Sequence, residues 1–265
     1  SVCAMEQIYN LSDLTKVLVF VLLSCSSAAL VYHVLNATIG KFNLPSDSYY
    51  GVNIIGTMTS LCSILLVFVL IQAISTNAKI NSIVSDQLSE MYKFEKHLMV
   101  MPKNYVNEIK PHFAAYIDSI ISDEWKLMGS KAKSNETEKR FDEFLASVAN
   151  IEDADSGPKL AKGDFATLTD GLSKVRYLKL RAKASSLPSE LYLGIVFLLL
   201  LNVFQFFLLA KRNNYSLSIL LLHVAAQGLV FGLIFVYDHP FYGERGVKAE
   251  AYLDVREKLN AIEGR

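Results

Sequence analysis

The chain has 265 residues, of which 52% are hydrophobic and 20% are charged, and its mean hydropathy is +0.29. Basic and acidic residues are equal in number, at 26 each, so the net charge of zero gives no electrostatic basis for binding nucleic acid. Cys3, Cys25 and Cys62 are too few and too scattered to predict a disulfide framework or a metal site. We therefore expect no metal and no cofactor.

Four apolar runs are each about long enough to cross the ~30 Å hydrocarbon core of a bilayer as a helix. They are Leu14–Leu35, Gly51–Ile74, Leu191–Ala210 and Leu217–Tyr237, with charged residues at their ends. The first run is too long for the apolar part of a signal peptide, so we expect it to remain as a span. The ends of the chain, residues 1–4 and 262–265, resemble sequence added for expression.

The first span carries small residues from Ser24 to Ala29, a composition that suits close packing against a neighbouring helix. A short loop then leads to Tyr49 and Tyr50, and aromatic residues of this kind anchor helices at the membrane surface.

The second run, Gly51–Ile74, has no charged side chain but is not uniformly apolar. At about 100° per residue, six positions three or four apart form a stripe roughly 80° wide. The stripe begins polar and becomes aliphatic: Asn53, Thr57, Ser60, Ile64, Val67 and Ile71. A helix that faces its own copies around an axis would use such a stripe to line a pore. The alternative is that the small residues merely allow close helix packing.

Helical spacing of apolar residues continues beyond the second span, which predicts one long helix as far as Pro102. Further helices are predicted at 105–128, 136–149 and 165–185, with a loop at 153–164 and a C-terminal helix from about residue 247. No segment has the period of a strand, so the fold class is all-α. The expected organisation is a tail at 1–13, two spans at 14–75, a helical domain at 76–186, two spans at 187–238 and a tail helix at 239–265.

Polar side chains inside the third and fourth spans need partners, because unpaired polar groups in hydrocarbon are costly. One interpretation is a proton or ion path, and the other is a hydrogen-bond cluster that holds the two spans together. Gly228 and Gly232 form a small-xxx-small pair that favours packing. The four polar residues are Asn202, Gln205, His223 and Gln227.

Signals for an enzyme are weak. The five histidines lack metal-ligand spacing, and no phosphate loop or nucleophile elbow is present, so enzyme activity is not expected. Asp153, Asp155 and Gly157 faintly resemble a calcium loop, but the later ligands are missing. Asp123 and Glu124 are expected to cap a helix or form surface salt bridges within the helical domain.

The distribution of basic residues predicts the orientation. More lysines and arginines lie at the membrane ends of the helical domain and both tails than in the two short opposite loops, which hold Lys41 and the Lys211–Arg212 pair. The positive-inside rule then places the termini and the insert in the cytoplasm. We expect a multi-pass integral membrane protein.

Three short motifs carry a resemblance to a known family. The first is Tyr116 followed by Asp123–Met128, and the second is Arg176–Arg181 leading to Leu187–Tyr192. The third follows the last span and includes Asp238, Pro240, Phe241, Gly243 and Glu244. Together with the order of spans and insert, they make the chain resemble the bacterial bestrophin-like membrane family of unknown function and, more distantly, the bestrophin anion channels.

The resemblance implies a homo-oligomer, a pentamer in bestrophins, whose second span lines an anion pore with an apolar neck. Ile64, Val67 and Ile71 occupy the matching part of the second span. Arg245 and Lys248 stand where animal bestrophins have an acidic run, so calcium gating is not expected. The leading hypothesis is an anion-preferring channel, such as one for chloride. The alternative is a non-conducting scaffold or accessory subunit of a larger membrane complex.

Overall fold

The computed structural model describes residues 11–38, 48–128, 132–153, 159–183, 187–209, 214–241 and 248–262, in which all of the regular secondary structure is helical. This confirms the predicted all-α class. The chain divides into two compact units, residues 1–77 with 186–245 and residues 78–185 with 246–265. Several predicted features lie outside the description: the side chains of Tyr49 and Tyr50, the loop residues Lys41, Lys211 and Arg212, the Asp155–Gly157 segment, and Gly243, Glu244 and Arg245.

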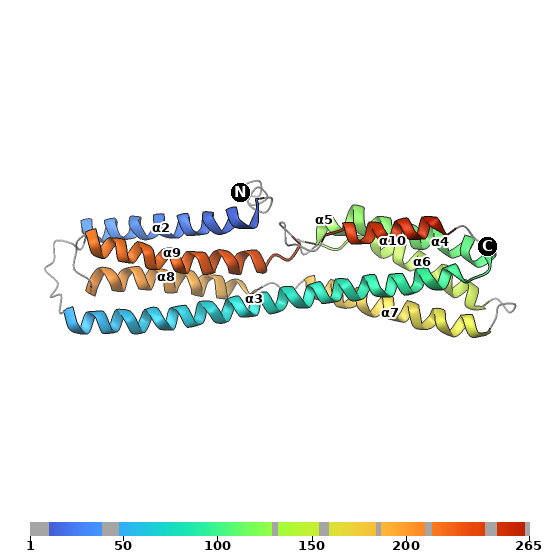
Figure 1. The fold of residues 1–265 in the computed structure, drawn as a ribbon, viewed down its shortest axis with the longest axis horizontal. Helices are drawn as coiled ribbons and strands as arrows, with labels where there is room; N and C mark the ends of the chain where they lie inside the picture. Colours follow the sequence, from blue (N-terminus) through green and yellow to red (C-terminus); the bar gives the residue numbers. More distant parts are fainter. Residues whose placement is uncertain are drawn as a thin grey trace. The chain divides into compact units, whose positions relative to one another are not determined.

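The first unit contains the four predicted spans. They are α2 (Asp13–Thr38), the N-terminal part of α3 (Ser48–Met99), α8 (Ser189–Leu209) and α9 (Asn214–Tyr237), which run side by side in Figure 1. Each of these helices is long and apolar enough to cross a membrane. The four-span prediction is therefore confirmed.

Close packing in this unit occurs between α2 and α9. A Cβ atom at Gly228 would lie 2.8 Å from Ser24 Oγ, and one at Gly232 would lie 2.9 Å from the Cα of Val17. The small-residue patch of the first span and the glycine pair of the fourth therefore serve one interface. The packing predicted from the glycine pair is therefore with span one.

Replacing Gly232 with valine is expected to destabilise the first unit by about 1–3 kcal/mol, because the new side chain overlaps backbone atoms of α2. Gly194→Val on α8 is the matched control, since a Cβ there meets nothing within 4 Å. Thermal unfolding of both variants in one detergent measures the difference. Equal midpoints would contradict the close approach of α2 and α9.

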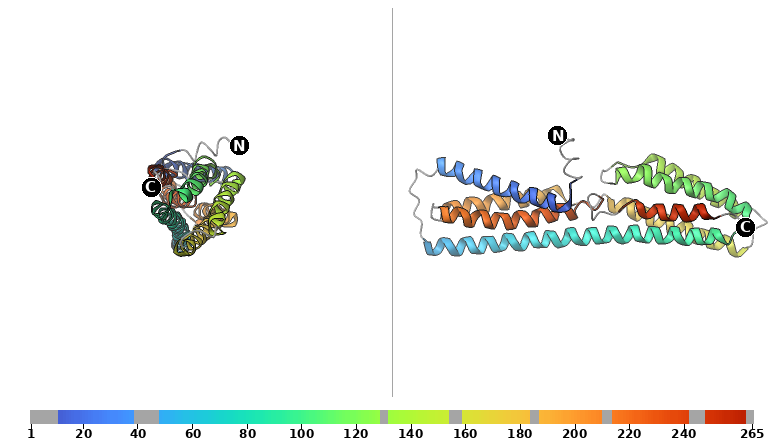
Figure 2. Two further views of the ribbon diagram at one scale, coloured as in Figure 1. Left: turned by 90° about the vertical axis from the view of Figure 1, so that its right-hand side faces the viewer. Right: turned by 45° about the horizontal axis from the view of Figure 1, so that its top comes forward.

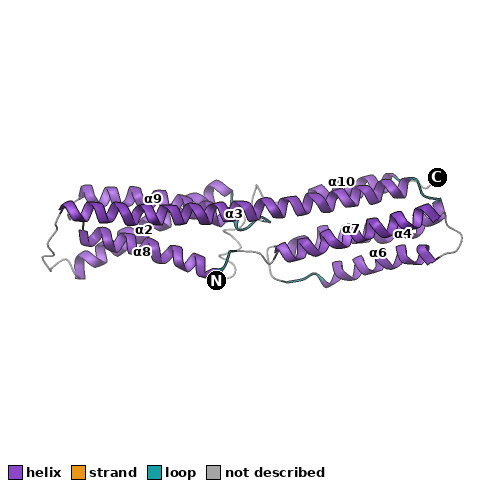
Figure 3. Ribbon diagram, turned by 90° about the horizontal axis from the view of Figure 1, so that it is seen from below, coloured by secondary structure: helices purple, strands orange, loops and turns teal. Residues whose placement is uncertain are grey.

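The second unit is a helical bundle around an aromatic core. Its helices are the C-terminal part of α3, α4 (Lys103–Ser119), the π-helical turn η1 (Ile120–Glu124), α5 (Trp125–Leu127), α6 (Asn135–Asp153), α7 (Lys159–Lys183) and α10 (Glu250–Ala261). Figure 2 shows α10 beside this part of α3, and Figure 3 shows α4 and α7 between α3 and α6. Phe94, Phe113 and Phe144 are fully buried, with ring centroids 4.8–5.1 Å apart.

Three predicted boundaries in the second unit differ from the structure. The segment predicted as a loop at 153–164 is helical from Lys159, a start that the sequence did not reveal because Gly163 and the few apolar residues there give no helical pattern. The helix predicted at 105–128 is interrupted by η1, which shifts the register after Ser119. The C-terminal helix begins at Glu250 rather than near 247.

Candidate functional site

One face of the membrane part of α3 is a buried packing seam. Cys62, Leu66, Val69 and Ala73 recur with helical spacing and are at most 8% exposed. The seam packs against Ile195 of α8 and Ile234 of α9. This contact fixes which way α3 is turned within the unit.

The stripe predicted from the sequence lies on the opposite side of α3. At 100° per residue its centre is about 170° from the centre of the seam. All six stripe residues are exposed in the single chain, with Ile64 at 65%, Val67 at 47% and Ile71 at 60%. Packing within the chain therefore does not account for the stripe, and a bilayer or further copies of the chain must cover it.

The polar part of the stripe has its hydroxyl groups committed to the helix. Thr57 Oγ1 donates to the Asn53 carbonyl at 2.9 Å, and Ser60 Oγ donates to the Gly56 carbonyl at 2.8 Å. Each hydroxyl must rotate away from the backbone before it can donate a hydrogen bond to an ion.

The four intramembrane polar residues form two separate groups. His223 and Gln227 on α9 are bonded to each other at 2.9 Å, while Asn202 Nδ2 on α8 donates to the Leu198 carbonyl at 3.0 Å. Within the described residues, no hydrogen bond joins the α8 pair to the α9 pair, and Gln205 Nε2 and Gln227 Oε1 are buried without a partner. Each of these two hydrogen bonds lies within one helix.

Two of the recognised motifs meet at the ends of the spans. Asp238, directly after α9, accepts a hydrogen bond from the Leu187 backbone N–H at 2.8 Å and from the Tyr192 hydroxyl at 2.6 Å. The carboxylate therefore binds the segment that begins α8, where the first-turn N–H groups favour negative charge. Pro240 and Phe241 follow in a turn.

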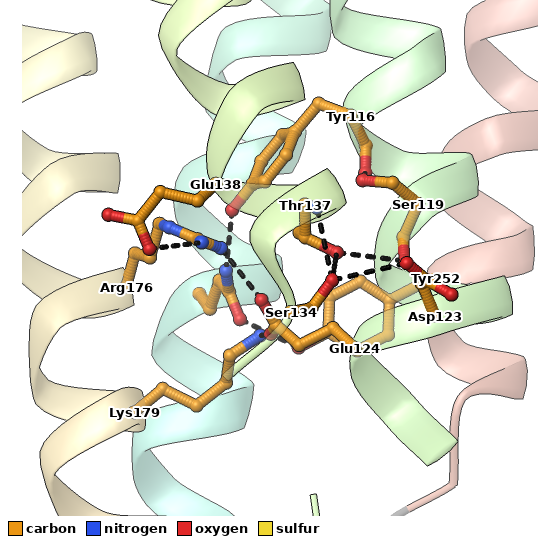
Figure 4. Close-up of polar contacts among 11 residues, drawn as sticks. Tyr116, Ser119, Asp123, Glu124, Ser134, Thr137, Glu138, Arg176, Lys179 and Tyr252 are labelled. Carbon is orange, nitrogen blue, oxygen red and sulfur yellow. Dashed lines mark hydrogen bonds and ion pairs between the residues drawn. The ribbon is translucent and has the colours of Figure 1, made fainter. Parts of the chain in front are cut away.

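The remaining motifs meet in the second unit, around Glu124 (Figure 4). Glu124 is 1% exposed and lies between Arg176, at 2.8 Å, and Lys179, at 2.5 Å, both on α7. Burial alone would raise the pKa of Glu124, but Lys179 and Arg176 outweigh it and hold the pKa below 4.5. The predicted salt bridge is confirmed, but Glu124 is a buried carboxylate and not a surface one.

Hydrogen bonds also join residues of α3, α4, α6 and α10 around this cluster. Gln87 of α3 donates to the Tyr116 hydroxyl at 3.2 Å and accepts from the Tyr252 hydroxyl of α10 at 2.8 Å. Ser134 caps the start of α6, since its Oγ accepts the Thr137 N–H at 3.1 Å, and it also reaches Asp123 at 3.3 Å. Figure 4 shows the labelled side chains of α4, η1, α6, α7 and α10 converging on this cluster.

Sequence reasoning did not identify Gln87, Lys179 or Tyr252 as members of this cluster. Gln87 left a readable signal, because it occupies the apolar register of α3 between Val84 and Met91. No group of three or more His, Cys, Asp and Glu residues able to hold a metal was found in the described part of the chain.

A comparison with protein families decides the assignment. A family model described as a Bestrophin-like domain matches residues 46–252, which is more than half of the chain. The chain belongs to the Bestrophin-like family. Its match spans all three recognised motifs and the whole of α3. With its four apolar helices, this bestrophin-like chain is an integral membrane protein.

Solved structures show the same fold. A bacterial bestrophin homologue from Klebsiella pneumoniae is 13% identical, with a TM-score of 0.67 over 94% of this chain and 97% of that chain. A variant of that homologue is 12% identical, with a TM-score of 0.66 over 94% of this chain and 100% of that chain. A crystal structure described as that of a membrane protein is 13% identical, with a TM-score of 0.69 over 94% of this chain and 99% of that chain. A search of curated proteins found no match.

Proposed function

We propose that the protein is an anion-preferring channel formed by a symmetric homo-oligomer, a pentamer by analogy with bestrophins. The observation that carries the proposal is the position of the α3 stripe, which is exposed and lies opposite the seam that fixes α3 in the unit. A ring that placed this face at its axis would cover the stripe by closed symmetry.

In this proposal the axis has two regions. Ile64, Val67 and Ile71 form an apolar neck, which can stop conduction by dewetting, and Asn53, Thr57 and Ser60 form a more polar mouth. None of the six carries a charge, so side-chain and backbone dipoles would have to provide the preference for anions. We propose that the protein lies in the bacterial inner membrane, with the helical unit and both termini in the cytoplasm.

The test is the reversal potential of purified protein in planar bilayers under a potassium chloride gradient. We expect a current that reverses close to the chloride equilibrium potential, because permeation of the anion then dominates. Bilayers that contain no protein provide the background. A reversal close to the potassium equilibrium potential would contradict anion preference, and the absence of current from a correctly assembled oligomer would contradict a channel.

A further inference from the structure

The first unit contains an apolar cavity of about 330 Å³ between α2, α8 and α9. This volume lies within the range of about 300–1,000 Å³ that is typical of small-molecule sites. The cavity is lined by residues of α2, α8 and α9, and no residue of the α3 stripe lines it. Its lining includes Phe20, Ala28, Val203, Val224 and Phe231.

The chemistry of the lining excludes a charged ligand group. No lining residue is charged, and Ser24 and Ser27 are the two that carry a side-chain polar atom. Ser27 Oγ donates to the Ser24 carbonyl at 2.9 Å, so that hydroxyl is already bonded within α2. A water or an ion would find too few polar partners here, whereas hydrocarbon fits the walls.

The cavity opens outward from the helices. Leu23 on α2 and Val196 and Leu200 on α8 line it, yet they are 59%, 43% and 45% exposed. An exposed apolar face of a membrane span is covered by lipid chains or by another copy of the chain. Because the mouth lies on α2 and α8 and not on the α3 face that the proposed ring covers, lipid is the occupant that we consider for it.

We propose that this cavity is a binding site for an acyl chain of a bilayer phospholipid. The acyl chain enters between Leu23 and Val196 and fills the space beside Ala28 and Val203. Filling restores the van der Waals contacts that the lining side chains would otherwise lack. Binding depends on the acyl chain of the lipid and not on its headgroup, because no basic side chain lines the site. The site is independent of whether the protein conducts ions.

The experiment uses full-length protein in nanodiscs that contain phosphatidylcholine with a photoreactive group in one acyl chain. After illumination, mass spectrometry is expected to find the label on peptides of α2 and α8 that line the cavity. Ser27→Phe places a ring in the cavity and is expected to lower this labelling at least about tenfold, equivalent to ~1.4 kcal/mol of binding free energy. Ser26→Phe is the matched control, since Ser26 is exposed but does not line the cavity.

A second pair keeps the test independent of any folding defect in α2. Val196→Trp at the mouth is expected to lower labelling like Ser27→Phe, while Leu193→Trp, at an exposed position of α8 outside the lining, is expected to leave it unchanged. Equal labelling of wild type and both cavity variants would overturn the proposal.

Other occupants predict different results. Phosphatidylglycerol and phosphatidylcholine probes that label alike support an acyl-chain site, whereas a strong preference for one headgroup overturns it. Labelling by a photoreactive free fatty acid without labelling by either phospholipid also overturns it. So does a cross-link between two copies of the chain through cavity residues, because a protein side chain would then be the occupant.

Discussion

Replacing Glu124 with glutamine is expected to destabilise the second unit by about 3–5 kcal/mol, because breaking a buried ion pair from one side leaves uncompensated charge. Arg176 and Lys179 would both remain buried, at 4% and 1% exposure. Their only close carboxylate besides Glu124 among the described ion pairs is Glu138, which reaches Arg176 at 3.9 Å and is 58% exposed. That contact is too weak to replace Glu124.

Unfolding by denaturant, followed by the fluorescence of the single tryptophan, Trp125, measures this effect next to the altered residue. Glu138→Gln is the matched control and is expected to cost no more than ~1 kcal/mol, as for exposed ion pairs. If the two variants unfold alike, Glu124 does not hold α7 to η1.

The wild-type protein should also lose stability in acid in a defined window. The folded-state pKa of Glu124 is lowered, so its contribution is present above the ordinary value of 4.5 and is lost as the pH falls through the lower folded value. The Glu124→Gln variant should not show this loss of stability, because it has no carboxyl group at this position to titrate.

Removing the neck side chains is expected to increase the ion current at least about tenfold, equivalent to ~1.4 kcal/mol off the barrier. The change is Ile64→Ala with Ile71→Ala, which widens the apolar constriction and lowers the cost of hydrating it. Single-channel recording in planar bilayers measures the effect and separates conductance from open time.

Leu65→Ala is the control for the neck. Leu65 is 50% exposed, similar to the neck residues, but it is turned about 100° from Ile64 around the helix. We expect it to leave conductance unchanged. A current that rises equally in the control, or stays unchanged in the double variant, would place the constriction elsewhere.

The spans and the long helix α3 could be predicted because their signals are local. Run length and hydropathy identify a span, and apolar spacing carries through Ile80, Val84 and Met91, with Gln87 as a polar residue in the same register. The stripe of α3 could be found in the same way. Its relation to the seam could not, because the seam is defined by contacts with Ile195 and Ile234, which are distant in sequence.

The contacts around Glu124 and Asp238 could not be predicted from the sequence, because the residues that make them are far apart along the chain. Glu124 and Arg176 are 52 residues apart, and Leu187 and Asp238 are 51 apart. The motifs that carry the family resemblance contain all four residues, yet nothing local shows that they meet. Nothing local identifies Lys179 as a buried partner of Glu124, for the same reason.

The measurement that tests the central claim most directly is single-particle imaging of the purified protein in nanodiscs. The proposed function predicts a closed ring of identical subunits, with α3 nearest the axis and Ile64, Val67 and Ile71 facing it. A single copy bound to other proteins, or a ring in which α3 faces the surrounding lipid, would contradict the pore.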